Sequence, residues 1–393
     1  MKKRIFLKGP FQTSSGYGVH SRQIARWAFD NKESSDCAID CLQTPWGNTP
    51  WILDPEYSDG LIGKIFQNSV LKPEFDTNLA IQIQLPNEWE RYVGAQHHIG
   101  VTAGVEVTKC NPAWRQGMEA MDMVIVPSEF TKQSLLTAWE GAEPKTRIEV
   151  IPESFIDEIL HSPKPLELNL ESDFNFLVVG QLTGNTVETD RKNIFNTIKW
   201  FCEAFQGDKN TGLVVKTNQS RNTSIDRKVC NELLIQAVYA SRKGDFPRVY
   251  FLHGNLSDEE MAGLYVHPKI KAFVSLTHGE GFGIPLLEAA ASGLPVIATA
   301  WSAHTEFLSK GKYRKVDYTL KPIPESKIDG KLFVPGAAWA YPSEQDFKKH
   351  IVKMRESYSM PLQWAKDLQK IIQAEYSFEA ISKRYENLLS KYL

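Results

Sequence analysis

Short apolar runs recur along the chain, and several are followed by a segment with the spacing of an amphipathic helix. The runs that we expect to form strands cover residues 5–7, 78–85, 98–103, 174–179, 249–252, 271–276 and 295–300. Helices are expected to begin near Val19, at Ile194 and after Ser257, which has the capping-box spacing with Glu260. Strands that alternate with helices are typical of α/β domains built on a parallel sheet. The 393 residues are enough for two such domains.

Composition narrows the class of protein. The net charge is −2, so no global charge recruits nucleic acid or an anionic membrane. The five cysteines are scattered and include no C-x-x-C pair, which favours reduced thiols in a cytosolic setting. No apolar run approaches the roughly 20 residues of a membrane span, and Met-Lys-Lys-Arg leads directly into the first expected strand. We therefore expect a cytoplasmic protein without an integral membrane segment.

The segment after residues 271–276 carries the most specific chemical signal. From His278 to Glu288 it reads H-G-E-G-F-G-I-P-L-L-E, a glycine-rich turn that leads into a helix. Backbone N–H groups in such a turn bind anions, usually phosphate, and the helix dipole adds to the attraction. Glu280 in the turn would repel a phosphate, so we expect Glu280 and Glu288 to accept hydrogen bonds from hydroxyl groups. A phosphate-binding turn beside two such carboxylates describes a site for a nucleotide sugar.

The sequence from Glu280, E-G-F-G-x-P-x-L-E-A-x-A-x-G-x-P-V-I-A, resembles the retaining glycosyltransferases of family four, of a type also found in bacteriophage genomes. The resemblance implies an α/β GT-B fold, in which two Rossmann-like domains face each other across a cleft. Residues 1–153 with the helix 377–393 would form the acceptor-side domain, and residues 154–376 the donor domain. The implied enzyme moves a hexose or related sugar from a nucleotide-diphosphate sugar to an acceptor hydroxyl.

The resemblance also implies roles for individual donor-binding residues. Glu280 would bind the sugar hydroxyls as a catalytic residue, and Glu288 would bind the ribose of the nucleotide. The turn would hold the diphosphate through its backbone, and a second loop would border the nucleobase. These two segments contribute Gly281, Phe282, Gly283 and Ile284, and Gly254, Asn255 and Leu256.

Cations for the diphosphate are expected just before the helix at Ile194. Lys192 matches the lysine of the family's R-K-x segment and is the second catalytic candidate, with Arg191 beside it. Gln181 stands where the family has an arginine. Either Arg191 and Lys192 carry the charge alone, or another cation substitutes, such as Lys216 or Arg221.

The first half of the chain offers two further candidates. A glycine-rich loop is expected between the first strand and the helix near Val19, and the resemblance implies that it reaches the donor diphosphate and sugar. Its donor-binding residues would be Gly16, Tyr17 and Gly18. Glu106, expected at a strand end, would position the acceptor hydroxyl or take its proton, although a structural acid is equally compatible with the pattern.

No metal or cofactor is expected. The sequence has no Asp-x-Asp, and no His or Cys cluster has the spacing of metal ligands. The donor is expected to be a UDP-sugar in preference to a GDP-sugar, and the protein to be a monomer or homodimer.

The acceptor stays open at this stage. Glycans, lipids and small molecules are candidates, as is a hydroxymethylated DNA base, because residues 310–331 hold seven basic and three acidic residues. A nucleotide-sugar isomerase or phosphorylase on the same fold, or a non-catalytic sugar-nucleotide binding protein, is the alternative function.

Overall fold

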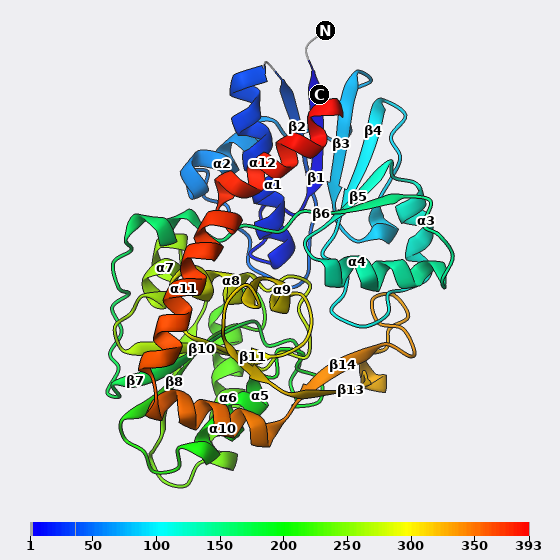
Figure 1. The fold of residues 1–393 in the computed structure, drawn as a ribbon. Coiled ribbons are helices and arrows are strands. Elements are labelled where there is room, and N and C mark those ends of the chain that lie inside the picture. The colour runs from blue at the N-terminus through cyan, green and yellow to red at the C-terminus, as the bar shows by residue number, and fades with distance from the viewer. Residues whose placement is uncertain (1–2, 36, 393) are drawn as a thin grey trace. The chain divides into compact units, whose positions relative to one another are not determined.

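The computed structural model describes residues 3–35 and 37–392, and the chain forms two compact units (Figure 1). Unit 1 comprises Met1–Ser154, Gly330–Val334 and Phe378–Leu393, and unit 2 comprises Phe155–Asp329 and Pro335–Ser377. Each unit contains a six-stranded parallel sheet with helices packed on it. The expected α/β class is therefore confirmed.

The sheet of unit 1 has the strand order β2-β1-β3-β4-β5-β6. In this register Ile5 on the second strand of that order lies opposite Ile39 on one side and Leu79 on the other. Its strands are β1 (Arg4–Gly9), β2 (Ala38–Gln43), β3 (Thr77–Ile83), β4 (Ala95–Val101), β5 (Met123–Val126) and β6 (Arg147–Val150). Its α-helices are α1 (Gly16–Ser35), α2 (Tyr57–Gln67), α3 (Trp114–Glu119), α4 (Glu129–Leu136) and α12 (Phe378–Leu389).

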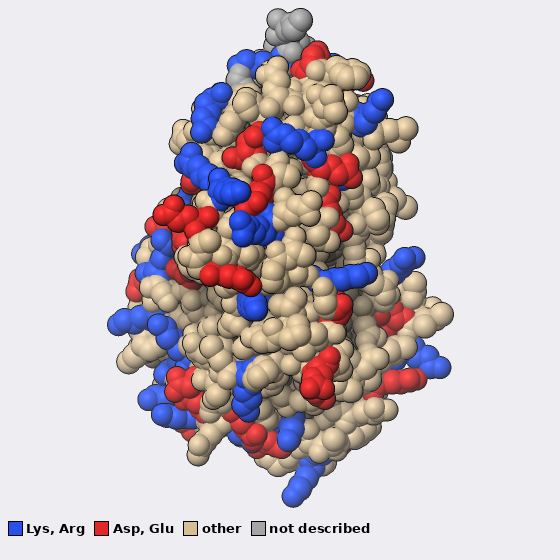
Figure 2. Space-filling view, turned by 90° about the vertical axis from the view of Figure 1, so that its right-hand side faces the viewer, with Lys and Arg blue, Asp and Glu red and all other residues tan. Residues whose placement is uncertain are grey.

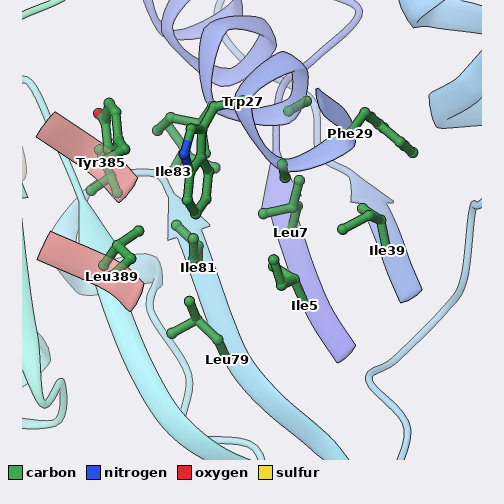
Figure 3. Packing of buried hydrophobic residues seen from close by; sticks show 14 of the residues in the cluster. Ile5, Leu7, Trp27, Phe29, Ile39, Leu79, Ile81, Ile83, Tyr385 and Leu389 are labelled. Atoms are coloured by element: carbon green, nitrogen blue, oxygen red, sulfur yellow. The ribbon is translucent and has the colours of Figure 1, made fainter. Parts of the chain in front are cut away.

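The core of unit 1 joins the two ends of the chain. Figure 3 shows Trp27 of α1 above the apolar side chains of β1 and β3, with Tyr385 and Leu389 of α12 beside it. The rings of Trp27 and Tyr385 lie 5.7 Å apart between centroids. The C-terminal helix is thus part of the core of the N-terminal unit.

The main sheet of unit 2 has the order β12-β11-β10-β7-β8-β9, and β13 and β14 form a separate antiparallel pair. Its strands are β7 (Phe174–Val179), β8 (Thr211–Thr217), β9 (Arg248–His253), β10 (Ile270–Ser275), β11 (Val296–Thr299), β12 (Arg314–Val316), β13 (Tyr318–Pro322) and β14 (Ala338–Pro342). Its α-helices are α5 (Ile194–Ala204), α6 (Ser224–Ser241), α7 (Asp258–Tyr265), α8 (Ile284–Ala291), α9 (His304–Leu308), α10 (Glu344–Glu356) and α11 (Ser359–Tyr376).

Several local predictions are confirmed at single-residue precision. Strand β7 covers the predicted residues, and helix α5 begins at Ile194 as expected. The capping box of α7 is formed: the N–H of Glu260 donates to Ser257 Oγ at 3.2 Å, and the N–H of Ser257 donates to Glu260 Oε2 at 2.8 Å.

The predicted start of the first helix near Val19 is wrong, because α1 begins at Gly16. Ser15 Oγ accepts the N–H of Gly18 at 3.0 Å, which satisfies a donor of the first turn as an N-terminal cap does. A Cβ at Gly18 would collide with the carbonyl oxygen of Thr13. The residues expected in a loop, from Gly16 to Gly18, therefore form the first turn of the helix.

Charged side chains of both signs are interspersed on the face drawn in Figure 2, as the net charge of −2 leads one to expect. None of the helices in the described part of the chain is long and apolar enough to cross a membrane.

Candidate functional site

The turn between β10 and α8 has the backbone conformation that the sequence predicted. Gly283 has φ +99°, and a Cβ at this position would lie 3.2 Å from the Cβ of His304. Both the backbone conformation and the limited space therefore favour glycine here. The carbonyl of Gly283 accepts the N–H groups of Leu286 and Leu287 at 3.0 and 3.1 Å. Pro285 lies in the first turn of the helix, where its missing N–H costs nothing.

Glu280 in this turn is buried and paired with cations. Both of its carboxylate oxygens accept a hydrogen bond from Lys192 Nζ at 2.7 Å, and Arg191 lies 3.8 Å away. Burial raises the pKa of Glu280, but Lys192 and Arg191 outweigh it and the pKa lies below its ordinary value. Glu280 is therefore an ionised acceptor, and its backbone N–H is fixed by Ser302 Oγ at 2.9 Å.

Asp190 holds the turn that carries the two cations. Its buried carboxylate accepts the N–H and the hydroxyl of Thr183 at 3.2 and 3.0 Å, and the N–H of Ile194 at 2.7 Å. Burial raises its pKa, and these hydrogen bonds oppose that rise. Asn193, with φ +57°, donates through Nδ2 to the carbonyl of Leu276 at 3.0 Å and so links this turn to the end of β10.

Glu288 lies about one turn into α8 and is also buried. The hydroxyl of Tyr265 donates to its Oε2 at 2.9 Å. Burial raises the pKa of Glu288 to about 8, while Tyr265 and Lys216 act in the opposite direction. Burial lowers the pKa of Lys216, and the charge of Glu288 acts against this lowering. Lys216 and Glu288 thus lie close enough to affect each other's pKa.

Gln181, which stands where the resembled family has an arginine, bonds to a neighbouring loop. Its Nε2 donates to the carbonyl of Gln219 at 2.9 Å, so the amide ties together the loops after β7 and β8. Arg221 is exposed. The cations that the structure places at Glu280 are Lys192 and Arg191.

The loop expected to border the nucleobase follows β9. Gly254 is buried with φ +107°, and a Cβ there would meet nothing within 4 Å. The glycine therefore serves the backbone conformation of the loop and not close packing. Asn255 is exposed and Leu256 is half-buried.

In unit 1 the structure brings Tyr17 close to Glu106. The hydroxyl of Tyr17 hydrogen-bonds to Thr102 Oγ1 at 2.7 Å and accepts the N–H of Ala103 at 3.1 Å. Burial raises the pKa of Tyr17, to which the charge of Glu106 contributes. The prediction that Glu106 lies at a strand end is wrong: β4 ends at Val101, and Glu106 lies in the loop beyond.

Ser302, which lies next to Glu280, in turn contacts His304. Ser302 has φ +80°, a backbone conformation that favours glycine, and its hydroxyl is 3.4 Å from His304 Nδ1. The buried ring of His304 contacts the carbonyl of Thr299 through Nε2 at 2.7 Å.

Although no cluster in the sequence has the spacing of metal ligands, the fold brings three such side chains together. Among the described residues, Asp226, Cys230 and His253 place ligand atoms within 4.8 Å of one another. The sequence spacing hid this group because His253 lies on another element, 23 residues beyond Cys230 (253 − 230).

Residues 245–318, which include Glu280 and Glu288, match the family described as glycosyl transferases group 1. The match covers 74 of the 393 residues (318 − 245 + 1) and lies within unit 2. The two parallel-sheet units have the GT-B fold, which the solved structures described below share.

One curated relative and several solved structures are similar to the chain. A probable sucrose-phosphate synthase of Thermosipho melanesiensis is 28% identical over 137 residues, which cover 34% of this chain and 26% of that protein. The chain therefore spans about a quarter of that relative's length.

Three of the similar solved structures cover 99% of the chain. Sucrose-phosphate synthase from Thermosynechococcus elongatus has a TM-score of 0.67 at 16% identity and covers 99% of both chains. Anabaena HepE in complex with UDP and glucose has a TM-score of 0.60 at 13% identity, over 99% of this chain and 100% of the other. An E. coli structure described as trehalose-6-phosphate bound with UDP-2-fluoro glucose has a TM-score of 0.65 at 9% identity and covers 99% of both chains. At these identities the likeness concerns the fold.

Proposed function

We propose that the protein is a retaining glycosyltransferase that needs no metal ion and moves a hexose or related sugar from a nucleotide-diphosphate sugar, UDP before GDP, to an acceptor hydroxyl. The observation that carries the proposal is the buried cluster of Glu280, Lys192 and Arg191 at the turn that begins α8. In this cluster an ionised carboxylate, which can accept hydrogen bonds from sugar hydroxyls, lies beside two cations and the backbone N–H groups of the turn. The cations and N–H groups are what a diphosphate requires.

The proposed transfer breaks the bond between the anomeric carbon and the diphosphate oxygen and forms a bond from that carbon to the acceptor oxygen. Lys192 and Arg191 stabilise the charge that develops on the departing diphosphate. Glu280 accepts hydrogen bonds from the sugar hydroxyls while the ring becomes positive. The acceptor attacks from the face that the diphosphate vacates, and its proton passes to the departing phosphate, so configuration is retained.

Metal independence follows from the same charges. A divalent ion in such a site would neutralise the diphosphate, and Lys192 and Arg191 supply that neutralisation here. We assign Glu288, with Lys216 close enough to affect its pKa, to the ribose and nucleotide end of the donor.

The names of two relatives bear on the class of acceptor. Two relatives are named as sucrose-phosphate synthases, so sugar phosphates stand first among the acceptors to try, before glycans, lipids and hydroxymethylated DNA. Several basic residues of the segment 310–331 are engaged locally: Lys310 pairs with Glu375 at 2.8 Å, and Lys327 donates to the carbonyl of Thr183 at 2.9 Å. This engagement favours a local role for the segment over a track for DNA phosphates.

The test is a panel of UDP- and GDP-sugars against these acceptors, with the anomeric configuration of the product read by NMR. Glu280→Gln removes the charge and keeps the shape, and we expect the barrier to rise by about 2–4 kcal/mol, a loss of roughly 30- to 1000-fold in turnover. Glu379→Gln, at an exposed ion pair on α12, is the control and should retain full turnover.

Full activity of Glu280→Gln would remove the assignment of Glu280. Consumption of the donor without transfer, or an inverted product, would replace the retaining transferase with another reaction on this fold. Binding of the donor with no turnover on any acceptor would favour the non-catalytic alternative.

A further inference from the structure

Three different metal-ligating side chains converge where α6 packs beside the end of β9. Asp226 and Cys230 are four residues apart on α6 and therefore lie on one face of the helix. His253 is the last residue of β9. The distance from Asp226 Oδ2 to His253 Nε2 is 3.0 Å, and that from Asp226 Oδ1 to Cys230 Sγ is 3.7 Å.

These side chains are withdrawn from solvent and held in place. The side chains of Asp226 and His253 are 2% and 7% exposed, and Cys230 is fully buried. Asp226 lies in the first turn of α6, where its N–H donates to the capping hydroxyl of Thr223 at 3.1 Å. The N–H of Gln219 donates to Asp226 Oδ1 at 3.3 Å, which orients the carboxylate between the thiol and the imidazole.

We infer that Asp226, Cys230 and His253 bind a divalent transition-metal ion of the zinc type. Tetrahedral zinc with bonds of about 2.0–2.3 Å places neighbouring ligand atoms about 3.3–3.7 Å apart. The distance of 3.7 Å lies at the upper end of this range, and that of 3.0 Å lies just below it. All three ligand atoms lie within 4.8 Å of one another, so small side-chain rotations would complete the site. The donor set of one sulfur, one nitrogen and one oxygen suits zinc, whereas calcium and magnesium prefer oxygen ligands. The fourth position is left for water, and the thiol proton passes to solvent when the ion binds.

The site is separate from the proposed chemistry. In the sheet order, β9 is an edge strand, whereas Glu280 and Lys192 follow the central strands β10 and β7. The ion would fasten the end of β9, and with it the loop that starts at Gly254, to the first turns of α6. None of its three ligands belongs to the proposed transfer site, so the ion would act on the stability of this part of unit 2, and its presence is compatible with sugar transfer that uses no metal.

Metal content and spectroscopy test the site without any assay of activity. The full chain is stripped with a chelator, loaded with Zn²⁺, passed through a desalting column and analysed by atomic emission. Co²⁺ is then used in place of zinc, because a bound thiolate gives a charge-transfer band in the near ultraviolet. We expect one equivalent of zinc per chain and this band in the wild-type protein.

Variants identify the ligands. Cys230→Ser should abolish the cobalt charge-transfer band. His253→Gln should lower zinc retention by about tenfold or more, because even changes to residues that only support a ligand typically cost about 10- to 100-fold in metal affinity. Cys202→Ser, at another buried cysteine on α5, is the matched control and should behave as wild type. Circular dichroism verifies that the variants fold. If Cys230→Ser fails to fold, the cobalt spectrum of the wild-type protein and the zinc retention of His253→Gln test the site.

The inference is overturned if the wild-type protein retains no zinc and shows no charge-transfer band. It is also overturned if His253→Gln retains as much zinc as wild type, or if Cys202→Ser loses the band.

Discussion

The behaviour of Glu280 depends on single neighbouring side chains. A carboxylate this deeply buried is stable as an ion only with a close partner, and Lys192 supplies one at 2.7 Å. A bound diphosphate would compete with Glu280 for the same ammonium group, which would free the carboxylate for sugar hydroxyls. The ion pair therefore couples the two halves of the proposed donor site.

Ser302 is the second residue on which this turn depends. It has φ +80°, which costs a non-glycine residue roughly 1–2 kcal/mol, and its hydroxyl accepts the N–H of Glu280. Ser302→Ala keeps the backbone strain and loses the hydrogen bond, so we expect a loss of about 1–2 kcal/mol in the free energy of unfolding. Ser302→Gly loses the bond but also the strain, and should cost less than half as much. Urea denaturation measures both, and a greater loss for the glycine variant would contradict this account.

At the next level, the turn before α5 shows how a helix start positions charged groups. Asp190 caps the first turn by accepting the N–H of Ile194 and also anchors Thr183, so Arg191 and Lys192 are held from both sides. Ser343 caps α10 by accepting the N–H of Asp346 at 3.3 Å and is not among the proposed site residues.

These two caps give a matched pair of variants. Asp190→Ala and Ser343→Ala should each lower stability, the latter by about 1 kcal/mol. Only Asp190→Ala should weaken the binding of UDP, by about tenfold (about 1.4 kcal/mol), with a smaller effect on uridine, which lacks the diphosphate. Calorimetry with both ligands measures this difference. Equal losses for UDP and uridine would show that Asp190 does not act through the two cations.

A buried carboxyl group near α12 makes stability depend on pH. Glu153 is buried, and its Oε2 has no hydrogen-bond partner in the part of the chain that the structure describes. Burial raises its pKa from 4.5 to about 8, whereas the unfolded chain ionises near 4.5. The contribution of the neutral carboxyl is fully present below pH 4.5 and is lost as the pH rises through about 8.

Glu153→Gln tests this dependence. The difference in unfolding free energy between wild type and variant should move in favour of the variant as the pH rises from about 5 to about 9, by roughly 3 kcal/mol. Urea denaturation at several pH values measures the difference, with Glu379→Gln as the exposed control. A constant difference across this range would mean that Glu153 is ionised in the folded protein at every pH tested.

The two units differ in how the chain builds them. Unit 1 combines residues from both ends of the sequence, since Ile381, Tyr385 and Leu389 of α12 are buried in its core. Each such side chain contributes about 1.5–3 kcal/mol on burial, and together they match a large part of the stability of a domain. Unit 2 draws its core from one nearly continuous stretch.

A chain that ends at Ser377 should therefore lose the structure of unit 1 and keep that of unit 2. We expect calorimetry to show the loss of one thermal transition, and UDP to raise the temperature of the transition that remains. The Tyr385→Ala variant, which retains the helix, should weaken the same transition by about 3–5 kcal/mol. If the truncated chain keeps both transitions, α12 is not essential to unit 1.

Local patterns in the sequence were sufficient for several of the elements and for the turn at the centre of the candidate site. Strand β7 and the capping box of Ser257 depend on neighbours within a few positions, so consecutive residues are enough to predict them. The glycines and Pro285 likewise indicate where α8 begins. The family resemblance added Lys192 and the two-domain GT-B form of the α/β class.

Other features were decided only by tertiary structure, because they depend on contacts between distant parts of the chain. Glu280 and Lys192 are separated by 88 positions, and no local pattern indicates that the two charges satisfy each other. The grouping of Asp226 and Cys230 with His253 likewise exists only once β9 lies beside α6. Burial and charge pairing are properties of the packed chain, so the chemistry of these groups is set by the fold, whereas the residues available for it are set by the sequence.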